Sequence, residues 1–566
     1  MNTVTGKRQA KLKAAMAVSR VFNFERRSEV RRRSDFKRSP GPLNSSAIVY
    51  NRSSSASYRT PLHGIELPAN FMSFGSAASS GDSSCDRDRG ESRAPHVDER
   101  DGAAPALKLH LKHRDAEAAE RSKKEALEDS SLRDSLRIQT LFRRITEKKN
   151  RIAASGIAAA AATADQSRIE VGQKETLAKS PELAGRLMAQ VESGVTLGSG
   201  EYFIDVFVGT PPRHFSLILD TGSDLNWIQC LPCYDCFEQH GPVYDPAASS
   251  SYRNVSCGDS RCGLVSSPDP LRPCLAATGQ DRPCPYFYWY GDRSNTTGDL
   301  ALETFTMNLT GVGEFRRVDD VIFGCGHWNR GLFHGAAGLL GLGRGQLSFA
   351  SQLRSLYGNI FSYCLVDRNS DLSVSSKLIF GEDDTVARNP LLNYTTFVAG
   401  KDSPVETFYY VQIKSILVGG EELAIPPTTW DIAKDSSGGT IVDSGTTLSY
   451  FAAPAYERIK EAFTKQVKYP AATDFPVLDP CYNVSGAGKV EVPEFAILFA
   501  DGAVWNFPPE NYFIRLEPEE IMCLAVLPMP QSPLSILGNY LQQNFHILYD
   551  MKNSRLGFAP TRCAEM

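Results

Sequence analysis

The chain has 566 residues, a formal net charge of −4 at pH 7, and 42% hydrophobic and 10% aromatic residues. This length is enough for two or three domains with buried cores, and the composition is typical of a folded protein. Residues 1–60 carry 14 Lys and Arg against only Glu25, Glu29 and Asp35. The remainder is therefore clearly acidic, which argues against nucleic acid as its main partner. No run approaches the roughly 20 apolar residues that cross a bilayer, so no transmembrane segment is expected.

Residues 1–106 are basic and rich in Ser and Gly, with little apolar periodicity. We expect this segment to be disordered or to act in targeting. Met1 to Phe24 has the positive charge of a secretory signal but lacks its apolar stretch of roughly 7–15 residues. Its Arg and Ser content is closer to that of an organelle transit peptide. A plastid location and a misassigned translation start both stay open for this part of the chain.

Residues 107–193 have a different pattern. Leu107 to His113 alternates apolar and basic residues, as a half-buried strand does. Such a strand is followed by apolar residues at near-helical spacing among Arg and Lys, namely Leu132, Leu136, Leu141 and Ile145. They predict a basic amphipathic helix, which could bind a membrane surface or calmodulin. Because the segment precedes an acidic region with two similar Asp motifs, we favour a propeptide.

After residue 193 the pattern indicates strands. Tyr202 to Val208 is one short alternating run, closed by a Gly-Thr-Pro-Pro turn. Helical patterns are few, and the clearest cover Phe349–Tyr357 and Pro454–Val467. The region therefore predicts two all-β lobes of under 200 residues each, over 194–383 and 384–566.

Two hexamers, one in each predicted lobe, share the same residue pattern. Residues 218–223 and 441–446 both read apolar-apolar-Asp-(Thr/Ser)-Gly-(Ser/Thr), and Asp220 and Asp443 lie 223 positions apart. One such hexamer would be an ordinary strand followed by a turn, in which the Asp is a cap or turn residue. Two of them suggest a duplicated half-domain, in which each half contributes one carboxylate to a shared site.

When two carboxylates are held close together, ionising both is unfavourable because the two negative charges repel each other. One therefore keeps a proton, and the pair combines a general base with a general acid. The ionised one can take a proton from a water that attacks a peptide carbonyl, while the other donates to the carbonyl oxygen. Gly222 and Gly445 permit tight turns that leave backbone N–H groups free for the carboxylates. Four hydroxyls can orient the pair further: Thr221, Ser223, Ser444 and Thr446.

These motifs resemble those of the pepsin-like aspartic proteases. Trp227 lies five residues past Gly222, as in that family. Tyr290-Gly291-Asp292 stands where the family has its flap hairpin, which makes Tyr290 the flap tyrosine. The segments Gly338–Leu342 and Ile536–Gly538 match the apolar-apolar-Gly segments that pass beneath each catalytic loop.

The resemblance covers roughly residues 195–563, about two thirds of the chain. It implies a bilobal all-β fold with a few short helices and an active site in the cleft between the lobes. It further implies an aspartic endopeptidase that is made as a zymogen, acts best at acid pH and requires no cofactor or metal. Asp220 and Asp443 would be the catalytic pair, and Tyr290 and Trp227 would help close the cleft over an extended polypeptide substrate. We expect a monomer whose other partner is its own propeptide.

One residue departs from the family pattern. The family flap usually reads Y-G-x-G-S, and Arg293 replaces the second Gly. A Gly at a hairpin tip often supplies a positive φ, which is unfavourable for Arg. Arg293 either points to solvent or hangs over the cleft and favours acidic or polar substrate side chains.

Cysteine usage indicates an oxidising compartment. Twelve of the thirteen cysteines lie between Cys230 and Cys563, and only Cys85 lies outside. An even dozen in one region favours a disulfide framework. Five glycosylation sequons in the same region agree with a secretory route: Asn254, Asn295, Asn308, Asn393 and Asn483. The closely spaced Cys230, Cys233 and Cys236 also allow a zinc site, completed by Cys257, Cys262, Cys274 or Cys284, although paired C-x2-C knuckles are missing.

The cysteine cluster resembles the cysteine-rich insert of the plant nepenthesin-like branch of the family, which has six bridges. The resemblance implies the following pairs: Cys230–Cys233, Cys236–Cys325, Cys257–Cys284, Cys262–Cys274, Cys364–Cys563 and Cys481–Cys523. Spacing alone does not fix this connectivity.

Two other functions stay open. Relatives on the same fold act as non-catalytic inhibitors or carbohydrate-binding proteins, but these usually lose one Asp or its Gly, and both are intact here. The basic N-terminus also allows an organellar protease that touches DNA. No H-E-x-x-H or G-x-S-x-G motif supports a competing hydrolase chemistry. We therefore favour an endopeptidase of the secretory pathway, extracellular or vacuolar.

Overall fold

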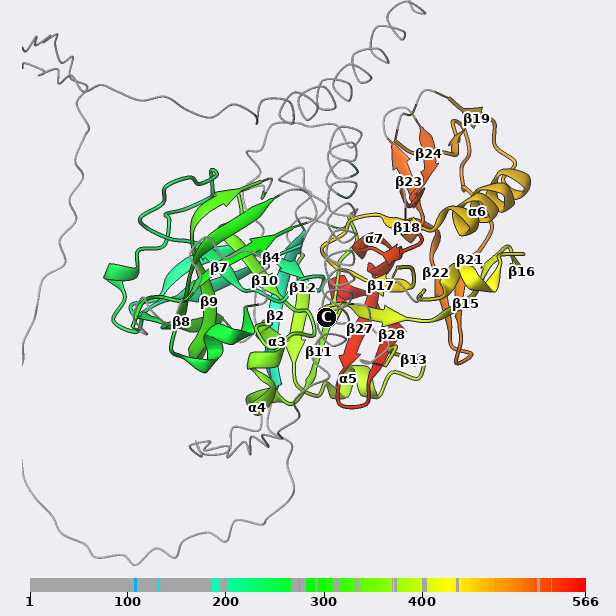
Figure 1. Cartoon of the computed structure of the whole chain (residues 1–566). Helices are drawn as coiled ribbons and strands as arrows, with labels where there is room; N and C mark the ends of the chain where they lie inside the picture. The colour runs from blue at the N-terminus through cyan, green and yellow to red at the C-terminus, as the bar shows by residue number, and fades with distance from the viewer. Residues whose placement is uncertain are drawn as a thin grey trace, which may run out of the picture. The chain divides into compact units, whose positions relative to one another are not determined.

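The structure is a computed structural model, shown in Figure 1. It describes most of residues 202–566, and before them 106–108, Ser131, Asp134 and 186–193. The gaps after residue 202 are 266–273, 275–280, 291–293, 309–314, 332, 334, 369, 371–373, 400–404, 434–436, 474, 476, 517–519 and 531.

Several expectations therefore fall on residues that are not described. They concern the basic segment over 1–106 apart from its last residue, with Cys85, and nearly all of the amphipathic helix over 132–145. The tip of the flap, with Arg293, also lies outside the described residues. For Asn308 only the backbone is described.

A sheet of 15 strands contains elements of both lobes. Its order is β13-β28-β27-β11-β12-β2-β3-β4-β10-β5-β9-β8-β6, with β1 paired to β2 and β7 paired to β8. The strands are β1 (Ala106–Lys108), β2 (Arg186–Ser193), β3 (Tyr202–Val208), β4 (Arg213–Asp220), β5 (Trp227–Gln229), β6 (Arg253–Asn254), β7 (Pro285–Trp289), β8 (Asn295–Asn308), β9 (Phe315–Arg330), β10 (Gly338–Gly341), β11 (Ile360–Cys364), β12 (Ser376–Phe380), β13 (Asn393–Thr396), β27 (Phe545–Asp550) and β28 (Arg555–Pro560).

Three smaller sheets belong to the C-terminal lobe. The first has the order β14-β17-β26-β18-β25, the second β16-β15-β21-β22 and the third β19-β20-β24-β23. Their strands are β14 (Tyr409–Val411), β15 (Ile413–Val418), β16 (Glu421–Glu422), β17 (Thr440–Val442), β18 (Ser449–Phe451), β19 (Ala471–Ala472), β20 (Cys481–Asn483), β21 (Phe495–Phe499), β22 (Val504–Phe507), β23 (Phe513–Leu516), β24 (Ile521–Leu524), β25 (Val526–Pro528) and β26 (Ser535–Leu537). In Figure 1 these yellow and orange strands lie on the opposite side of β11 and β27 from the green N-terminal lobe.

The described helices are short except for one. They are α3 (Phe349–Gln352), α4 (Arg354–Tyr357), α5 (Asp384–Ala387), α6 (Ala453–Gln466) and α7 (Asn539–Gln542). The two helices expected from the sequence are confirmed, although the first is split into α3 and α4. In α6 the residues Ala455, Tyr456, Ile459 and Phe463 are buried. They form the apolar stripe of an amphipathic helix that packs on a core. The all-β bilobal prediction is thus confirmed.

The two lobes repeat one arrangement of three strands. In the N-terminal lobe β10 pairs in parallel with β4 and antiparallel with β5. In the C-terminal lobe β26 pairs in parallel with β17 and antiparallel with β18. Each apolar-apolar-Gly segment thus inserts beside the strand that leads into an Asp motif, so the duplication inferred from the hexamers is present in the fold.

Close backbone approach explains the glycines of these inserted segments. A Cβ on Gly338 would lie 1.9 Å from the carbonyl oxygen of Trp227, and one on Gly538 would lie 2.1 Å from that of Leu448. Both contacts are with backbone atoms, which cannot move aside as a flexible side chain can. Only Gly is therefore compatible with this crossing in either lobe.

The 15-stranded sheet crosses the boundary expected at residue 193. Strand β2 pairs antiparallel with β12, where Met188 faces Ile379, and with β3, where Glu192 faces Phe203. Strand β1 is a three-residue parallel partner of β2 and includes the first two residues of the strand expected over 107–113, whose other residues lie outside the described part of the chain. The proposed end of the propeptide at residue 193 stays a prediction.

The structure contains six disulfides, and four of them differ from the pairs implied by the resemblance. Cys230 bonds to Cys325 rather than to Cys233, and Cys233 bonds to Cys236. The reason lies in the strand pairing: β5 runs parallel to β9 with Ile228 beside Cys325. This register holds the Cα atoms of Cys230 and Cys325 5.3 Å apart, a normal disulfide separation.

The second correction concerns four cysteines that lie close together. Cys257 bonds to Cys274 and Cys262 bonds to Cys284. The Sγ atoms of Cys262 and Cys274, which belong to different disulfides, are only 3.7 Å apart. The expected pair Cys262–Cys274 and the observed pairs are therefore nearly equivalent in space, and spacing in the sequence does not distinguish them. Three of these sulfurs lie within 4.8 Å of one another, as in a zinc site, but each is bonded to another sulfur. Cys364–Cys563 and Cys481–Cys523 are paired as expected.

Candidate active site

The first Asp motif forms a tight turn at the end of β4. The carboxylate of Asp220 accepts a hydrogen bond from the Gly222 N–H at Oδ1, at 2.9 Å, and another from the Ser223 hydroxyl at Oδ2, at 2.5 Å. Asp220 is wholly buried. Both of its oxygens are therefore fixed in direction by neighbours two and three residues further along the chain.

The second Asp motif repeats this geometry after β17. The Gly445 N–H donates to Oδ1 of Asp443 at 3.0 Å, and the Thr446 hydroxyl donates to Oδ2 at 2.6 Å. Asp443 is also wholly buried. A buried carboxylate needs such donors, because desolvation of an unpaired charge is very costly.

The two motifs are joined by a reciprocal pair of hydrogen bonds. The Ser444 N–H donates to Oγ1 of Thr221 at 2.8 Å, and the Thr221 N–H donates to Oγ of Ser444 at 3.1 Å. The Ser444 hydroxyl donates in turn to the carbonyl oxygen of Leu219 at 3.2 Å. The residues that follow Asp220 and Asp443 are thus in direct contact across the lobes, as the shared site requires.

A matched support lies behind each motif, and it could not be recognised from the sequence pattern. Six residues after Asp220, the side-chain oxygen of Asn226 accepts a hydrogen bond from the Gly341 N–H at 3.1 Å. Six residues after Asp443, the hydroxyl of Ser449 accepts one from the Gly538 N–H at 3.0 Å. Each connects the loop of an Asp motif to the inserted apolar-apolar-Gly segment. Asn and Ser are so common in turns that neither position could be singled out beforehand.

A buried tyrosine pair lies beneath the first motif. Tyr549 on β27 and Tyr363 on β11 are 2.8 Å apart at their hydroxyls, and Tyr363 donates to the side-chain oxygen of Gln542. Burial raises the pKa of Tyr549, and hydrogen bonds with Tyr363 and Thr221 offset only part of this effect. Burial likewise raises the pKa of Tyr363 well above its usual value. Both phenols therefore stay protonated, and hydrogen bonds connect Gln542, Tyr363 and Tyr549 close to Thr221 of the first Asp motif.

The aromatic residues expected at the cleft lie together. The rings of Trp227 and Tyr290 are 6.2 Å apart between centroids, and Phe333 packs against both. Trp227 is wholly buried and Tyr290 is 5% exposed. The indole N–H of Trp227 has no acceptor among the described residues. These rings lie at the end of the hairpin formed by β7 and β8, next to the undescribed residues 291–293.

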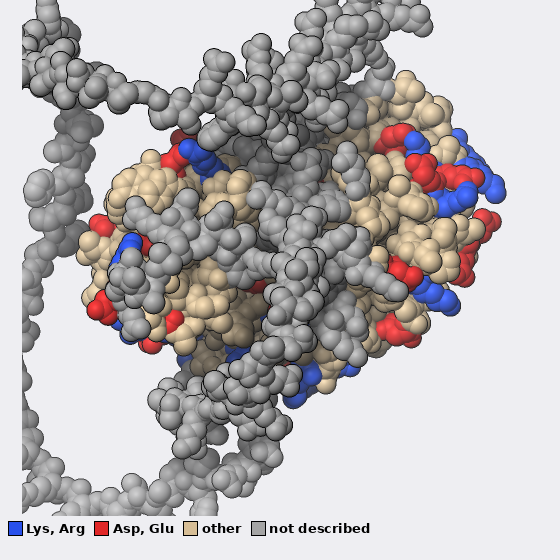
Figure 2. All heavy atoms as spheres, viewed as in Figure 1, with Lys and Arg blue, Asp and Glu red and all other residues tan. Residues whose placement is uncertain are grey.

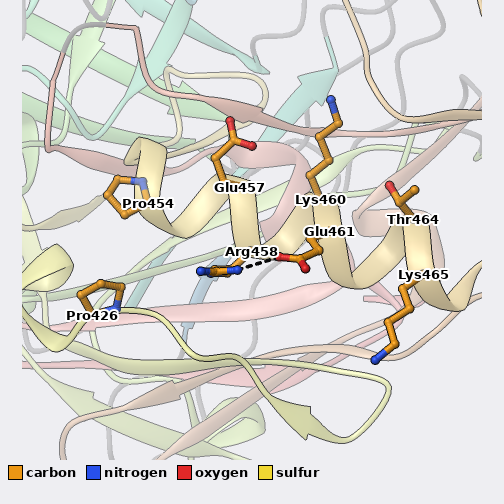
Figure 3. Close-up of a pocket in the computed structure, with 8 residues that line it drawn as sticks. All are labelled: Pro426, Pro454, Glu457, Arg458, Lys460, Glu461, Thr464 and Lys465. Carbon is orange, nitrogen blue, oxygen red and sulfur yellow. Dashed lines mark hydrogen bonds and ion pairs between the residues drawn. The ribbon is translucent and has the colours of Figure 1, made fainter.

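A pocket of about 830 Å³ lies elsewhere, along α6 (Figure 3). Its lining contains none of the residues of the two Asp motifs and comprises Pro426, Pro454, Glu457, Arg458, Lys460, Glu461, Thr464 and Lys465. Figure 2 shows basic and acidic residues intermixed on this part of the surface. Arg458 pairs with Glu461 at 2.7 Å, and Lys460 pairs with Asp479 at 2.5 Å. The pocket is a charged, solvated helix face rather than the active site.

The sequons lie at the surface where their side chains are described. Asn254, Asn393 and Asn483 are exposed and Asn295 is half-buried. Among the described residues, no helix is both long and apolar enough to cross a membrane.

Family models match both lobes. Residues 202–382 match the model described as xylanase inhibitor N-terminal, and residues 408–560 match that described as xylanase inhibitor C-terminal. Among solved structures, the chain is similar to edgp, with a TM-score of 0.57 and 21% identity over 68% of this chain and 97% of that one. Soybean basic 7S globulin gives a TM-score of 0.52 and 19% identity over 67% of this chain and 97% of that one. At these identities the likeness shows the fold alone.

Curated relatives are more similar in sequence. Protein aspartic protease in guard cell 2 of Arabidopsis thaliana is 38% identical over 376 residues, 66% of this chain and 75% of that protein. Aspartic proteinase nepenthesin-2 of Nepenthes gracilis is 38% identical over 376 residues, 66% of this chain and 80% of that protein. Nepenthesin-1 of the same plant is 37% identical over 379 residues, 66% of this chain and 80% of that protein. Given these relatives and the pepsin-like fold, the chain belongs to the nepenthesin-like family of plant aspartic proteases and is an aspartic-type endopeptidase.

Proposed function

We propose that Asp220 and Asp443 activate one water between them to hydrolyse a peptide bond. The ionised carboxylate takes a proton from the water, which attacks the scissile carbonyl, while the protonated carboxyl donates to the carbonyl oxygen. The tetrahedral intermediate then collapses as the leaving nitrogen receives a proton from the pair. Which Asp carries the proton at rest is a property of the pair rather than of either residue.

The observation that carries this proposal is the reciprocal hydrogen bonding of Thr221 and Ser444. It holds the two Asp motifs against each other, and the donors at Gly222, Ser223, Gly445 and Thr446 fix the direction of each carboxylate. Two carboxylates fixed in this way favour sharing a proton, because a second negative charge at close range is costly. An acid pH optimum follows, since the pair must retain one proton to work.

We propose further that the enzyme is made as a zymogen, with residues 107–193 as its propeptide. The cleft would lie between the lobes, and Trp227 and Tyr290 would support the flap over an extended polypeptide. Arg293, in that flap, would then either face solvent or favour acidic and polar substrate side chains. Cleavage profiles of wild type and Arg293→Gly on a peptide library would distinguish these two roles.

The six disulfides and the exposed sequons support a secretory location, extracellular or vacuolar, and glycosylation at the exposed Asn residues. We propose that the mature enzyme works as a monomer. A plastid location would follow if the transit-like N-terminus were used. A fluorescent fusion to the full chain that enters the secretory pathway would decide against the plastid.

An inhibitor on this fold is the second candidate, since both family models carry the name of xylanase inhibitors. Intact hydrogen bonding at both Asp motifs favours the enzyme. The decisive experiment is to acidify the purified chain and follow peptide cleavage and N-terminal processing with and without pepstatin. Asp443→Ala should lower the rate by about 10⁴-fold or more. Asp384→Ala, which changes an exposed Asp at the start of α5 that pairs with Arg388, is the control. Cleavage that survives Asp443→Ala would overturn the proposal.

A further inference from the structure

A carboxylate from far upstream in the sequence binds the chain directly after the second Asp motif. Oδ1 of Asp134 accepts a hydrogen bond from the Thr447 N–H at 2.9 Å, and Oδ2 accepts one from the Leu448 N–H at 2.8 Å. The hydroxyl of Tyr450 donates to the same Oδ2 at 3.2 Å. Asp134 is 2% exposed, and Ser131, one helical turn before it, is 8% exposed. Three hydrogen-bond donors thus surround one buried carboxylate, as they do in a site that binds an anion.

The receiving loop is adjacent to the catalytic machinery. Thr447 follows Thr446, the residue whose hydroxyl holds Oδ2 of Asp443. The loop is fixed from its other side by α7, because the Asn539 N–H donates to the carbonyl of Thr446 at 2.8 Å and the Tyr540 N–H to that of Thr447 at 3.0 Å. The carbonyls are thus satisfied within the lobe, and the two N–H groups of Thr447 and Leu448 are satisfied by Asp134.

The N-terminal lobe provides an internal comparison. Asp224 occupies the position equivalent to Thr447, four residues after the catalytic Asp. Its N–H donates to the hydroxyl of Tyr288 at 3.3 Å, and its carboxylate accepts from the Gly345 N–H and the Thr407 hydroxyl. These partners of Asp224 all belong to the region that contains the two Asp motifs. The Thr447 N–H instead donates to Asp134, a residue 313 positions upstream.

We propose that the N–H groups of Thr447 and Leu448, with the hydroxyl of Tyr450, form a carboxylate-binding site whose intramolecular ligand is Asp134. In the uncleaved chain, this contact anchors the upstream segment beside the catalytic pair. The inference rests on the proposed function, because an anchor at this loop matters only if Asp443 is catalytic. Removing the carboxylate leaves two buried N–H groups without their acceptor, which destabilises the anchored state. The uncleaved Asp134→Ala chain is therefore more open and more active than wild type.

The first test reads the contact itself and needs no activity. Full-length chains carrying Asp443→Ala, which prevents self-cleavage, are compared by amide hydrogen exchange with and without Asp134→Ala. Exchange at the amides of Thr447 and Leu448 should rise at least tenfold with the second substitution. The control is Asp129→Ala, which removes the same charge from the same upstream segment. Unchanged exchange in Asp134→Ala, or an equal rise in Asp129→Ala, overturns the proposal.

The second test reads the consequence for the site. Full-length wild type, Asp134→Ala and Asp129→Ala are mixed with a short fluorogenic peptide, and the initial rate is recorded before N-terminal processing begins. Asp134→Ala should start several-fold faster, while all three reach the same final rate after processing. Equal initial rates overturn the anchor but leave the proposed function intact. If no chain ever cleaves the peptide, the proposed function fails instead, and the exchange experiment still decides whether Asp134 is bound.

Discussion

Thr221 and Ser444 each donate a backbone N–H to the other's side-chain oxygen, at 3.1 and 2.8 Å, although 223 residues separate them. Because both groups are buried, this reciprocal pair leaves no polar atom of the contact to water. Together with the hydrogen bond from the Ser444 hydroxyl to the Leu219 carbonyl, it joins the two Asp motifs directly. The position of one carboxylate relative to the other therefore depends on these two short hydroxyl side chains.

Replacing Thr221 by Val should lower both activity and stability. The substitution keeps the shape of the side chain but removes the acceptor of the Ser444 N–H, and an unsatisfied buried donor costs about 1–3 kcal/mol. We expect kcat to fall by about 10- to 100-fold with a smaller change in KM, because the carboxylates shift relative to each other. Thr221→Ser, which retains the hydroxyl, should keep most of the activity. A Thr221→Val enzyme with wild-type kcat would contradict this role.

The hydroxyl of Tyr549 should also support the contact between Thr221 and Ser444. Tyr549→Phe removes the hydroxyl that contacts Tyr363 and Thr221. We expect a loss of about 1 kcal/mol in the free energy of unfolding and a several-fold lower kcat. Tyr512→Phe is the matched control, since it removes a hydroxyl that donates to the Pro493 carbonyl at 2.8 Å in the C-terminal lobe. An equal loss of kcat in both variants would show that Tyr549 acts through stability alone.

The residues that we propose for the chemistry were predictable because their types are tied to that role. A carboxylate pair needs Asp, a tight turn needs Gly, and hydroxyls that orient the pair must be Ser or Thr, so the two hexamers stand out in the sequence. The supporting residues do not. Asn226, Ser449 and Tyr549 act through partners that are distant in sequence, and each type is equally ordinary in a turn or a core. Asp134 was missed for the same reason.

The disulfide pairing shows a second limit of prediction from the sequence. The even number of cysteines in one region predicted which of them form bridges, but the partners implied by the resemblance were wrong around Cys257, where two bridges lie in contact. Strand register decides the pairing of Cys230 with Cys325, and register depends on the whole sheet rather than on local spacing. The pairs Cys364–Cys563 and Cys481–Cys523 came out as the resemblance implied, since neither has a third cysteine nearby along the chain.

Loss of the Cys364–Cys563 bridge should destabilise the enzyme more than loss of Cys481–Cys523. The first closes a loop of 199 residues between the lobes and the second a loop of 42. In the chain-entropy model, closing the longer loop stabilises the folded state by about 1.4 kcal/mol more. Double Cys→Ala variants at each bridge, made in the Asp443→Ala background, should show the difference as a lower midpoint of chemical unfolding for Cys364/Cys563. Equal midpoints would mean that the unfolded chain is not restrained by the longer loop.

Acid stability should depend in part on Asp259, which caps a short helix in the cysteine-rich insert. Its side chain accepts hydrogen bonds from the N–H and guanidinium of Arg261. Chiefly because of the Arg261 side chain, the pKa of Asp259 falls from 3.8 to about 2. A carboxyl whose pKa is lowered on folding stabilises the folded state above its unfolded pKa, and this contribution disappears as the pH falls through the folded pKa. The window is therefore between about pH 4 and pH 2.

Asp259→Asn keeps a good capping side chain but removes the charge. Because both side chains are partly exposed, the contribution of the pair is about 0.5 kcal/mol, and we expect a melting temperature about 1 °C lower at pH 7. The difference from the parent should shrink between pH 4 and pH 2, since protonation then removes the same charge from the parent. Melting curves in the Asp443→Ala background measure this without self-digestion, and Asp384→Asn controls for a general loss of negative charge. A difference that stays constant down to pH 2 would show that the loss of stability does not come from the charge of Asp259 or its ion pair with Arg261.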